Sequence, residues 1–338
     1  MTTAATGPQI DHRDLAWAPD ELLDGYESAP LGPATLVRRT GRPAAPRGVV
    51  LHVHGYNDYF FQAHLADALN DAGYVFYAVD LRRAGRSLLR PVPVADGGVG
   101  PLRPPHFTTS LREFGLDLDA ASAAVRDAEP GLPLAVHAHS TGGLTSAMWA
   151  HAHATDGDGG GPDALVLDSP FLDLTGSWLS RQVSSGVLGV LGRMRPLAVL
   201  STHPSTYATF QLAANGGRWD FDTRLKKPEG QPARAGWLRA VRRAHGRLVR
   251  GLGITVPVLV ARSASSGPDC LDNPDLDRQD TVLDTVRIGH LAPRVGSDVT
   301  ELLVPDGVHD LCLSREEPRA LYLTAVTEFL DAGLGRDA

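Results

Sequence analysis

Short apolar runs that alternate with segments of helical length place the strongest constraint on the fold of this chain. Six runs are rich in branched residues and are bounded by turn residues, at positions 47–55, 74–81, 133–140, 164–170, 257–263 and 299–304. Strands of this kind are buried on both faces, as in a parallel sheet. Amphipathic segments lie between them, at 62–72, 111–128, 143–154, 280–292 and 318–330. The alternation predicts an α/β fold with a mostly parallel sheet, and two earlier runs at 27–31 and 34–40 predict an antiparallel hairpin at its edge.

One interval, residues 171–251, breaks this alternation because it holds no apolar run typical of a core strand. It contains three of the five tryptophans and both lysines of the chain. A structureless loop of about 80 residues is uncommon in a compact domain, whereas a helical insertion of that size is not. Residues 237–250 alternate apolar residues and arginines as an amphipathic helix does. We therefore expect an insertion that covers one end of the sheet.

The composition argues against several classes of protein. A net charge of −7 does not suit binding to nucleic acid through phosphate contacts. Two cysteines are too few for a disulfide scaffold or a thiolate zinc site. The first 28 residues lack the apolar stretch of a signal peptide, and no run approaches the roughly 20 apolar residues that span a bilayer. We expect a soluble, cytoplasmic protein with no nucleic-acid partner and no stable membrane insertion.

A candidate nucleophile lies at the end of the third of the six runs, 133–140, which leads into a helical segment. The residues at this junction are Ala138-His139-Ser140-Thr141-Gly142. Small residues around a serine allow a sharp strand-to-helix turn that exposes the hydroxyl at the carboxyl edge of the sheet, as in a nucleophile elbow. The alternative role of Ser140 is to cap the helix.

Backbone donors for an oxyanion are predicted from a second strand end. The run 47–55 ends in His54-Gly55, and a turn of this kind directs the next backbone N–H toward the same edge of the sheet. The N–H groups of Tyr56 and Thr141 are therefore the predicted oxyanion hole.

An acid and a histidine follow Ser140 in the chain order Ser, Asp, His that this architecture requires. His309 comes soon after the run 299–304 and is the predicted general base. Asp280, at the start of the segment 280–292, is the predicted acid that orients it. Asp168 and Asp173 remain alternatives for this acid.

Candidate substrate-binding residues are the aromatic side chains near the predicted oxyanion turn and in the insertion, together with the histidine before the nucleophile. They are Tyr59, Phe60, His139, Trp178, Tyr207 and Phe210. The alternative role of the aromatic residues is to pack the insertion onto the core.

A metal site is not expected, although two His-x-His pairs, at 52/54 and 137/139, lie on runs that we expect to be neighbouring strands. Each pair directs at most two imidazoles to each face of the sheet, and no carboxylate lies beside either pair in the sequence. No nucleotide-binding glycine motif is present either. We therefore expect neither a metal nor another cofactor.

These motifs resemble the α/β-hydrolase superfamily, and within it the serine aminopeptidase and monoglyceride-lipase-like (lysophospholipase-like) branch. The matching residues are His54-Gly55, the stretch 80–87, the elbow 139–143, Asp280 and His309-Asp310. The resemblance implies an eight-stranded, mostly parallel sheet flanked by helices, with a lid inserted after the sixth strand. Two residues depart from the branch, because Ala138 replaces the first elbow glycine and Arg83 replaces a glycine in the D-x-x-G-x-G-x-S loop.

We predict a serine hydrolase that cleaves a carboxylic ester through an acyl-enzyme on Ser140, the ester being like a monoacylglycerol or lysophospholipid or another small apolar ester. The alternatives are an aminopeptidase, an acyltransferase or cyclase, and a ligand-binding protein without hydrolytic activity. An ester is favoured over a peptide because the insertion offers few carboxylates, Asp220, Asp222 and Glu229, to hold a substrate amine. The predicted parts are an N-terminal extension (1–29), a core (30–170 and 252–332) and a lid (171–251).

Overall fold

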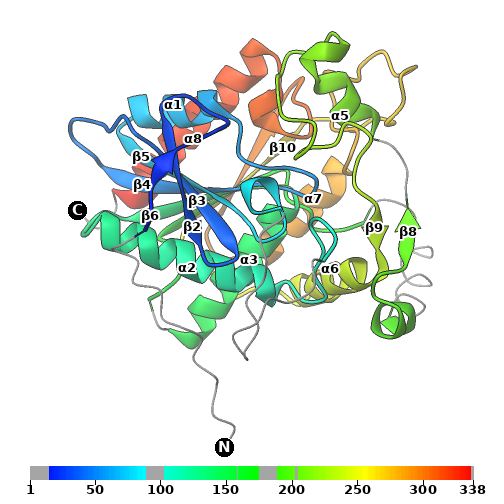
Figure 1. The fold of residues 1–338 in the computed structure, drawn as a ribbon, viewed down its shortest axis with the longest axis horizontal. Coiled ribbons are helices and arrows are strands. Elements are labelled where there is room, and N and C mark those ends of the chain that lie inside the picture. Colours follow the sequence, from blue (N-terminus) through cyan, green and yellow to red (C-terminus); the bar gives the residue numbers. More distant parts are fainter. Residues whose placement is uncertain (1–14, 89–102, 158, 175–188, 202–204, 336–338) are drawn as a thin grey trace, which may run out of the picture.

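The computed structural model describes residues 15–88, 103–157, 159–174, 189–201 and 205–335, and a nine-stranded sheet forms its centre (Figure 1). The strands follow the order β1-β2-β3-β5-β4-β6-β7-β10-β11. From β5 onward in this order all neighbours pair in parallel, whereas β1, β2 and β3 form an antiparallel edge. The bounds are β1 Ala18–Pro19, β2 Tyr26–Leu31, β3 Ala34–Arg39, β4 Gly48–Val53, β5 Tyr74–Asp80, β6 Leu134–His139, β7 Ala164–Asp168, β10 Val258–Ser263 and β11 Val299–Val304. The predicted α/β class and the edge hairpin are confirmed.

The first strand corrects two details of the prediction. Eight strands are predicted, and the structure adds β1, which pairs with β2 through Ala18 and Ser28. The predicted N-terminal extension 1–29 is therefore wrong in its last part, because β1 and the first residues of β2 belong to the sheet. A two-residue edge strand that contains a proline has no apolar run by which to find it.

Helices cover both faces of the sheet. On β4, Val49, Leu51 and Val53 join one buried cluster with α2, α3 and α7, whereas Val50 joins a second with α1 and α8. Successive side chains of a strand point to opposite faces, so the two clusters are the two sides of an α/β/α sandwich. The bounds are α1 Ala63–Asp71, α2 Arg112–Ala128, α3 Thr141–Asp156, α7 Thr285–Leu291 and α8 Glu316–Leu334. Among the described residues, no helix combines the length and the apolar character needed to cross a membrane.

The segment between β7 and β10 adds no strand to the central sheet within its described residues. It forms its own two-stranded ribbon and short helices, grouped on one side of the sheet at the right of Figure 1. The elements are β8 Val199–Ser201, α5 Thr206–Gln211, β9 Ala233–Arg234 and α6 Ala235–Leu248. The amphipathic helix predicted over 237–250 is thus present as α6, which buries Trp237, Val241 and Leu248.

Candidate active site

Ser140 occupies a sharp turn between β6, which ends at His139, and α3, which begins at Thr141. Its backbone has φ 53° and ψ −116°, a conformation that residues other than glycine rarely adopt. The turn is held in place because the N–H of Ser140 donates to the carbonyl oxygen of Asp168, 2.9 Å away on β7. Ala138 lies within β6 and is not among the positive-φ residues, so the first elbow position does not require glycine.

Gly142 permits the close approach of α3 to the end of β4. A Cβ at this position would lie 2.4 Å from the carbonyl oxygen of His54 and 2.8 Å from that of Val53. No side chain fits at these distances, so this glycine sets how closely the elbow approaches the turn after β4.

His309 links Ser140 to a buried carboxylate. Its Nε2 lies 3.0 Å from Ser140 Oγ, and its Nδ1 lies 2.9 Å from Asp280 Oδ2. All three side chains are buried. The other oxygen of Asp280 accepts the N–H groups of Val282 and Leu283, each over 2.8 Å. The carboxylate is thereby fixed in the orientation that accepts a hydrogen bond from the imidazole.

These contacts distinguish Asp280 from the two alternative acids. Asp168 accepts the N–H of Leu311 beneath the His309 loop, and Asp173 pairs with Arg242 and Arg287. Asp280 is the carboxylate on His309 Nδ1. The predicted helix 280–292 is wrong at its start, because the turn that Asp280 closes delays α7 until Thr285.

The two predicted oxyanion donors lie beside Ser140. Tyr56 and Thr141 line the same cavity as Ser140 and His309. Within the described part of the chain, neither backbone N–H has a hydrogen-bond partner. Thr141 is the first residue of α3, so its N–H is one of the unpaired donors that every helix has at its N-terminus, where partial positive charge accumulates.

The cavity has a volume of about 240 Å³ and mixed walls. Its apolar wall includes Tyr56, Phe171, Trp237, Val282 and Leu283, and its polar wall includes Asn57, Asp58, His139 and Lys226. Two of the predicted substrate-binding residues, His139 and Tyr207, line it. The Tyr207 hydroxyl accepts the N–H of Asp310, and its ring meets the His309 ring edge-on at 5.9 Å.

Three other predicted pocket residues, Tyr59, Phe60 and Phe210, do not line the cavity. The prediction for Tyr59 and Phe60 is wrong, because the chain turns back into the core after Gly55. Tyr59 packs on Phe61, and its hydroxyl accepts the N–H of Asp222. Phe60 is fully buried against Tyr26 and Phe76. Phe210 is half-buried and does not line the cavity, and Trp178 lies outside the described residues.

Several cavity residues escaped the sequence-based prediction. Trp237 lies on the apolar face of α6, where it is hard to distinguish from a packing residue. Lys226 had a detectable signal, because it is one of only two lysines in the chain and both lie in the insertion. Val282 and Leu283 reach the cavity because the turn around Asp280 replaces the predicted helix.

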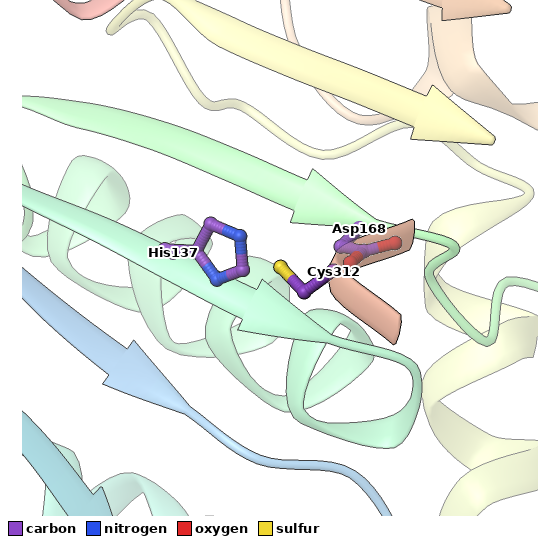
Figure 2. A group of neighbouring side chains, drawn as sticks. All are labelled: His137, Asp168 and Cys312. Atoms are coloured by element: carbon purple, nitrogen blue, oxygen red, sulfur yellow. The ribbon is translucent and has the colours of Figure 1, made fainter. Parts of the chain in front are cut away.

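Carboxylates do lie beside the two His-x-His pairs, contrary to the argument from sequence. Parallel pairing of β6 and β7 sets His139 opposite Asp168. His137, Asp168 and Cys312 lie together (Figure 2). Their potential ligand atoms are within 4.8 Å of one another, and Asp58, His139 and Asp310 form a second such group. The premise that no carboxylate lies beside these pairs is therefore wrong, and the absence of a metal stays a prediction without that support.

In the first group, both ring nitrogens of His137 already have other partners. His137 Nδ1 lies 3.0 Å from His52 Nδ1, and its Nε2 lies 2.8 Å from the Tyr322 hydroxyl. Burial raises the pKa of the Cys312 thiol, which opposes the thiolate that binds metal. In the second group, Lys226 Nζ lies 2.9 Å from Asp58 Oδ1 and supplies a cation.

Arg83, the second departure from the branch, has a left-handed backbone with φ 64°. Such a conformation explains why the branch has glycine here, since a side chain in this region costs about 1–2 kcal/mol. The buried guanidinium donates to Glu113 Oε2 over 2.7 Å and lies over the ring of Phe114. This ion pair offsets the backbone strain and ties the loop after β5 to α2.

We expect Arg83→Gly to be more stable than Arg83→Ala by about 1 kcal/mol in urea denaturation. Both variants lose the ion pair with Glu113, so the difference isolates the cost of a Cβ at φ 64°. The matched control is Glu328, an exposed residue inside α8, where the alanine variant is expected to be the more stable. An Arg83→Ala variant as stable as Arg83→Gly contradicts the strain at this position.

Comparison with known proteins agrees with this architecture. The family model for serine aminopeptidase, S33, matches residues 44–264, more than half of the chain. A monoacylglycerol lipase from Paleococcus ferrophilus superposes with a TM-score of 0.61 at 20% identity, over 86% of this chain and 97% of that one. A soluble variant of the Saccharomyces cerevisiae monoglyceride lipase, in complex with a substrate analog, gives 0.64 at 17% identity, over 95% and 94%. A carboxyl esterase from Bacillus coagulans gives 0.58 at 15% identity, over 95% and 98%.

No curated protein matches the chain in sequence. At these identities the solved structures establish the fold, and the family model establishes the kinship. The predicted resemblance to the serine aminopeptidase and monoglyceride-lipase-like branch is confirmed. The chain belongs to the serine aminopeptidase S33 family and has the α/β-hydrolase fold.

Proposed function

We propose that the protein is a serine hydrolase that cleaves a carboxylic ester through an acyl-enzyme on Ser140. The observation that carries this proposal is the position of His309, bonded on one nitrogen to Ser140 Oγ and on the other to buried Asp280. An imidazole held in this way has the tautomer that accepts the hydroxyl proton.

The reaction has two halves. Ser140 Oγ attacks the ester carbonyl carbon while His309 Nε2 takes the hydroxyl proton, and the N–H groups of Tyr56 and Thr141 stabilise the oxyanion. When the carbonyl reforms, the C–O bond to the alcohol breaks and His309 gives its proton to the leaving alcohol. Water then attacks the acyl-enzyme by the same route and releases the acid and free Ser140. Asp280 orients His309 and stabilises its cation in both halves.

An ester is favoured over a peptide by the charges around the cavity. An aminopeptidase needs an available carboxylate to hold the substrate's ammonium. Among the described residues that line the cavity, Asp58 is the only carboxylate, and it is paired with Lys226. The lipases and the esterase among the solved structures with this fold also favour an ester.

We propose that residues 171–251 act as the lid. Phe171, Tyr207, Lys226 and Trp237 belong to this segment and line the cavity together with Ser140 and His309. The core of 30–170 and 252–332, extended at its start by β1 and the beginning of β2, holds the reacting groups. Substrate access then depends on the segment between β7 and β10.

Fluorophosphonate labelling tests the proposal, because an activated serine displaces fluoride and keeps the phosphonyl group. We expect an adduct on the Ser140 peptide and hydrolysis of p-nitrophenyl esters. Asp280→Asn is expected to lower kcat by about 10³–10⁴-fold, since the amide favours the wrong imidazole tautomer. The matched control is Asp284→Asn, which keeps an N-cap on α7 and is expected to retain activity.

Each alternative predicts a different result. Failure to form an adduct favours a ligand-binding protein, and an adduct without ester hydrolysis favours an acyltransferase or cyclase. Hydrolysis of amino-acid p-nitroanilides but not of esters favours an aminopeptidase. Any of these three results overturns the proposed esterase.

A further inference from the structure

Three ionisable side chains with no part in the proposed ester chemistry meet in the wall of the cavity. Asp58 follows β4, His139 ends β6, and Lys226 comes from the insertion. Their exposed fractions are only 2%, 5% and 5%. Charged groups are buried to this extent only when they are paired or bind something.

The ammonium of Lys226 is only partly satisfied by the protein. Its Nζ donates to Asp58 Oδ1 over 2.9 Å and lies 4.8 Å and 5.4 Å from the ring centres of Phe61 and Phe221. An ammonium has three N–H donors, and Asp58 is its one hydrogen-bond acceptor among the described residues. Lys226 therefore has donors left for a ligand in the cavity.

His139 is less satisfied still. Its Nδ1 lies 3.6 Å from Asp58 Oδ2, which is too far for a hydrogen bond. In the described part of the chain, both ring nitrogens of His139 and Asp58 Oδ2 are buried without any hydrogen-bond partner. Burial alone would lower the pKa of His139, but the carboxylates of Asp310 and Asp58 outweigh it and raise the pKa to about 9. At neutral pH His139 is therefore a cation with two unpaired N–H donors.

The chemistry of this wall selects among ligand groups. Lys226, His139 and Asp58 face the cavity, and Asp310 lies in one group with His139 and Asp58, their potential ligand atoms within 4.8 Å of one another, so two carboxylates balance the two cations. The spare polar groups on the two cations are N–H donors. An alkyl group leaves buried N–H donors without acceptors, which is costly. A carboxylate supplies two acceptor oxygens for these spare N–H donors, and charge-assisted hydrogen bonds are the strong ones. At about 240 Å³ the cavity is below the size typical of drug-sized ligands, so the chain that carries this carboxylate is short.

We propose that Lys226 and His139 form a subsite for a carboxylate on the substrate, so that the preferred substrates are short esters with a free carboxylate. The inference rests on the proposed ester hydrolysis and names its substrate class. Because both cations line the cavity that holds Ser140, the carboxylate and the scissile ester belong to one small molecule. The carboxylate belongs either to the acyl group or to the alcohol.

The test compares two pairs of esters. In each pair one ester carries a carboxylate, and the other has an isopropyl group of similar shape in its place. Monomethyl succinate and methyl isocaproate form the acyl-side pair, and O-acetylated hydracrylate and isoamyl acetate form the alcohol-side pair. Turnover of all four is followed by pH-stat at neutral pH. We expect kcat/KM to favour the carboxylate by about tenfold or more in one pair, and that pair identifies the side on which the carboxylate lies. A ratio near one or below in both pairs overturns the subsite.

Lys226→Met is expected to bring the ratio within the selective pair down to about one, because the ammonium is replaced by a thioether of similar length. The matched control is Lys227→Met. It removes the same charge from the next residue, whose side chain does not line the cavity. It is expected to leave the ratio unchanged. If Lys226→Met fails to fold, the double variant Asp58→Asn, Lys226→Met removes both charges together and is expected to lose the preference as well. A preference that survives loss of Lys226 contradicts the proposal.

Failure of the subsite and failure of the proposed function give different results. If the wild-type protein hydrolyses none of the four esters, the proposed function falls. The subsite is then tested by calorimetric binding of monomethyl succinate to the wild-type and Lys226→Met proteins. A dissociation constant weakened about tenfold or more by the substitution supports the subsite, and equal constants overturn it.

Discussion

Replacing Ser140 with alanine is expected to lower kcat/KM for ester hydrolysis by about 10⁶-fold while the fold stays intact. The substitution removes only Oγ, the atom 3.0 Å from His309 Nε2. Without it neither the acyl-enzyme nor the proton transfer to His309 can occur. The oxyanion donors and the cavity remain, so the residual rate exceeds that in water by about 10³–10⁴-fold. The measurement is turnover of a p-nitrophenyl ester by enzyme freed of wild-type contamination.

A second serine provides the control for this experiment. Ser169 is also buried at the end of a strand and has a positive φ of 43°, but the described His309 contacts do not include it. Ser169→Ala is expected to keep kcat/KM within about threefold of wild type. Both variants keep a Cβ at a strained position, so their unfolding free energies are expected to stay within about 1 kcal/mol of wild type. A Ser140→Ala enzyme within tenfold of wild-type activity would remove Ser140 from the mechanism.

The sheet was predictable because a strand covered on both faces must be apolar at almost every position. All residues of β4 and β6 are buried, and the runs 47–55 and 133–140 differ from the observed strands by only one or two residues at each end. The meeting of Ser140 and His309 was predictable for a related reason. Both follow parallel strands, whose carboxyl ends share one edge of the sheet.

The polar interior could not be read from the sequence because it depends on register and on loop paths. Asp168 is 29 residues from His139 in the chain and becomes its neighbour only through the pairing of β6 with β7. Asp58 and Lys226 come from a turn and from the insertion, and a single contact of 2.9 Å joins them. The failed pocket predictions for Tyr59 and Phe60 have the same origin, because one bend after Gly55 decides whether an aromatic side chain enters the cavity or the core.

The buried histidines lead to a second large effect, a steep loss of stability in mild acid. Four of them have a pKa lowered by burial, to about 3 for His106, to about 4 for His137 and His245, and well below the usual value for His52. In the unfolded chain each takes up a proton near pH 6.5. Below that pH the unfolded state binds protons that the folded state does not, so the free energy of unfolding falls as the pH falls.

Two buried carboxylates act in the opposite direction. Burial raises the pKa of Asp117, and burial with the neighbouring Asp310 raises that of Asp168. Their folded forms hold protons that the unfolded chain releases above pH 3.8, so they favour folding increasingly as the pH falls toward that value. His139 has a raised pKa, and its stabilising contribution is complete below about pH 6.5 and is lost only as the pH rises through about 9. The net expectation between pH 6 and 4.5 is that the free energy of unfolding falls with the pH, because the four histidines outnumber the two carboxylates.

His106 allows this expectation to be tested one proton at a time. Its φ is 55°, a conformation that asparagine tolerates well, so His106→Asn is expected to fold and to remove one titrating group. Urea denaturation at several pH values between 4.5 and 6 is expected to give a slope of unfolding free energy against pH that is about 1.4 kcal/mol per unit smaller than in wild type. The matched control, His290→Asn, replaces an exposed histidine and is expected to leave the slope unchanged. Equal slopes in wild type and His106→Asn would show that His106 takes up its proton as readily in the folded state as in the unfolded state. Burial of His106 against Tyr56 and His54 would then not keep the imidazole neutral.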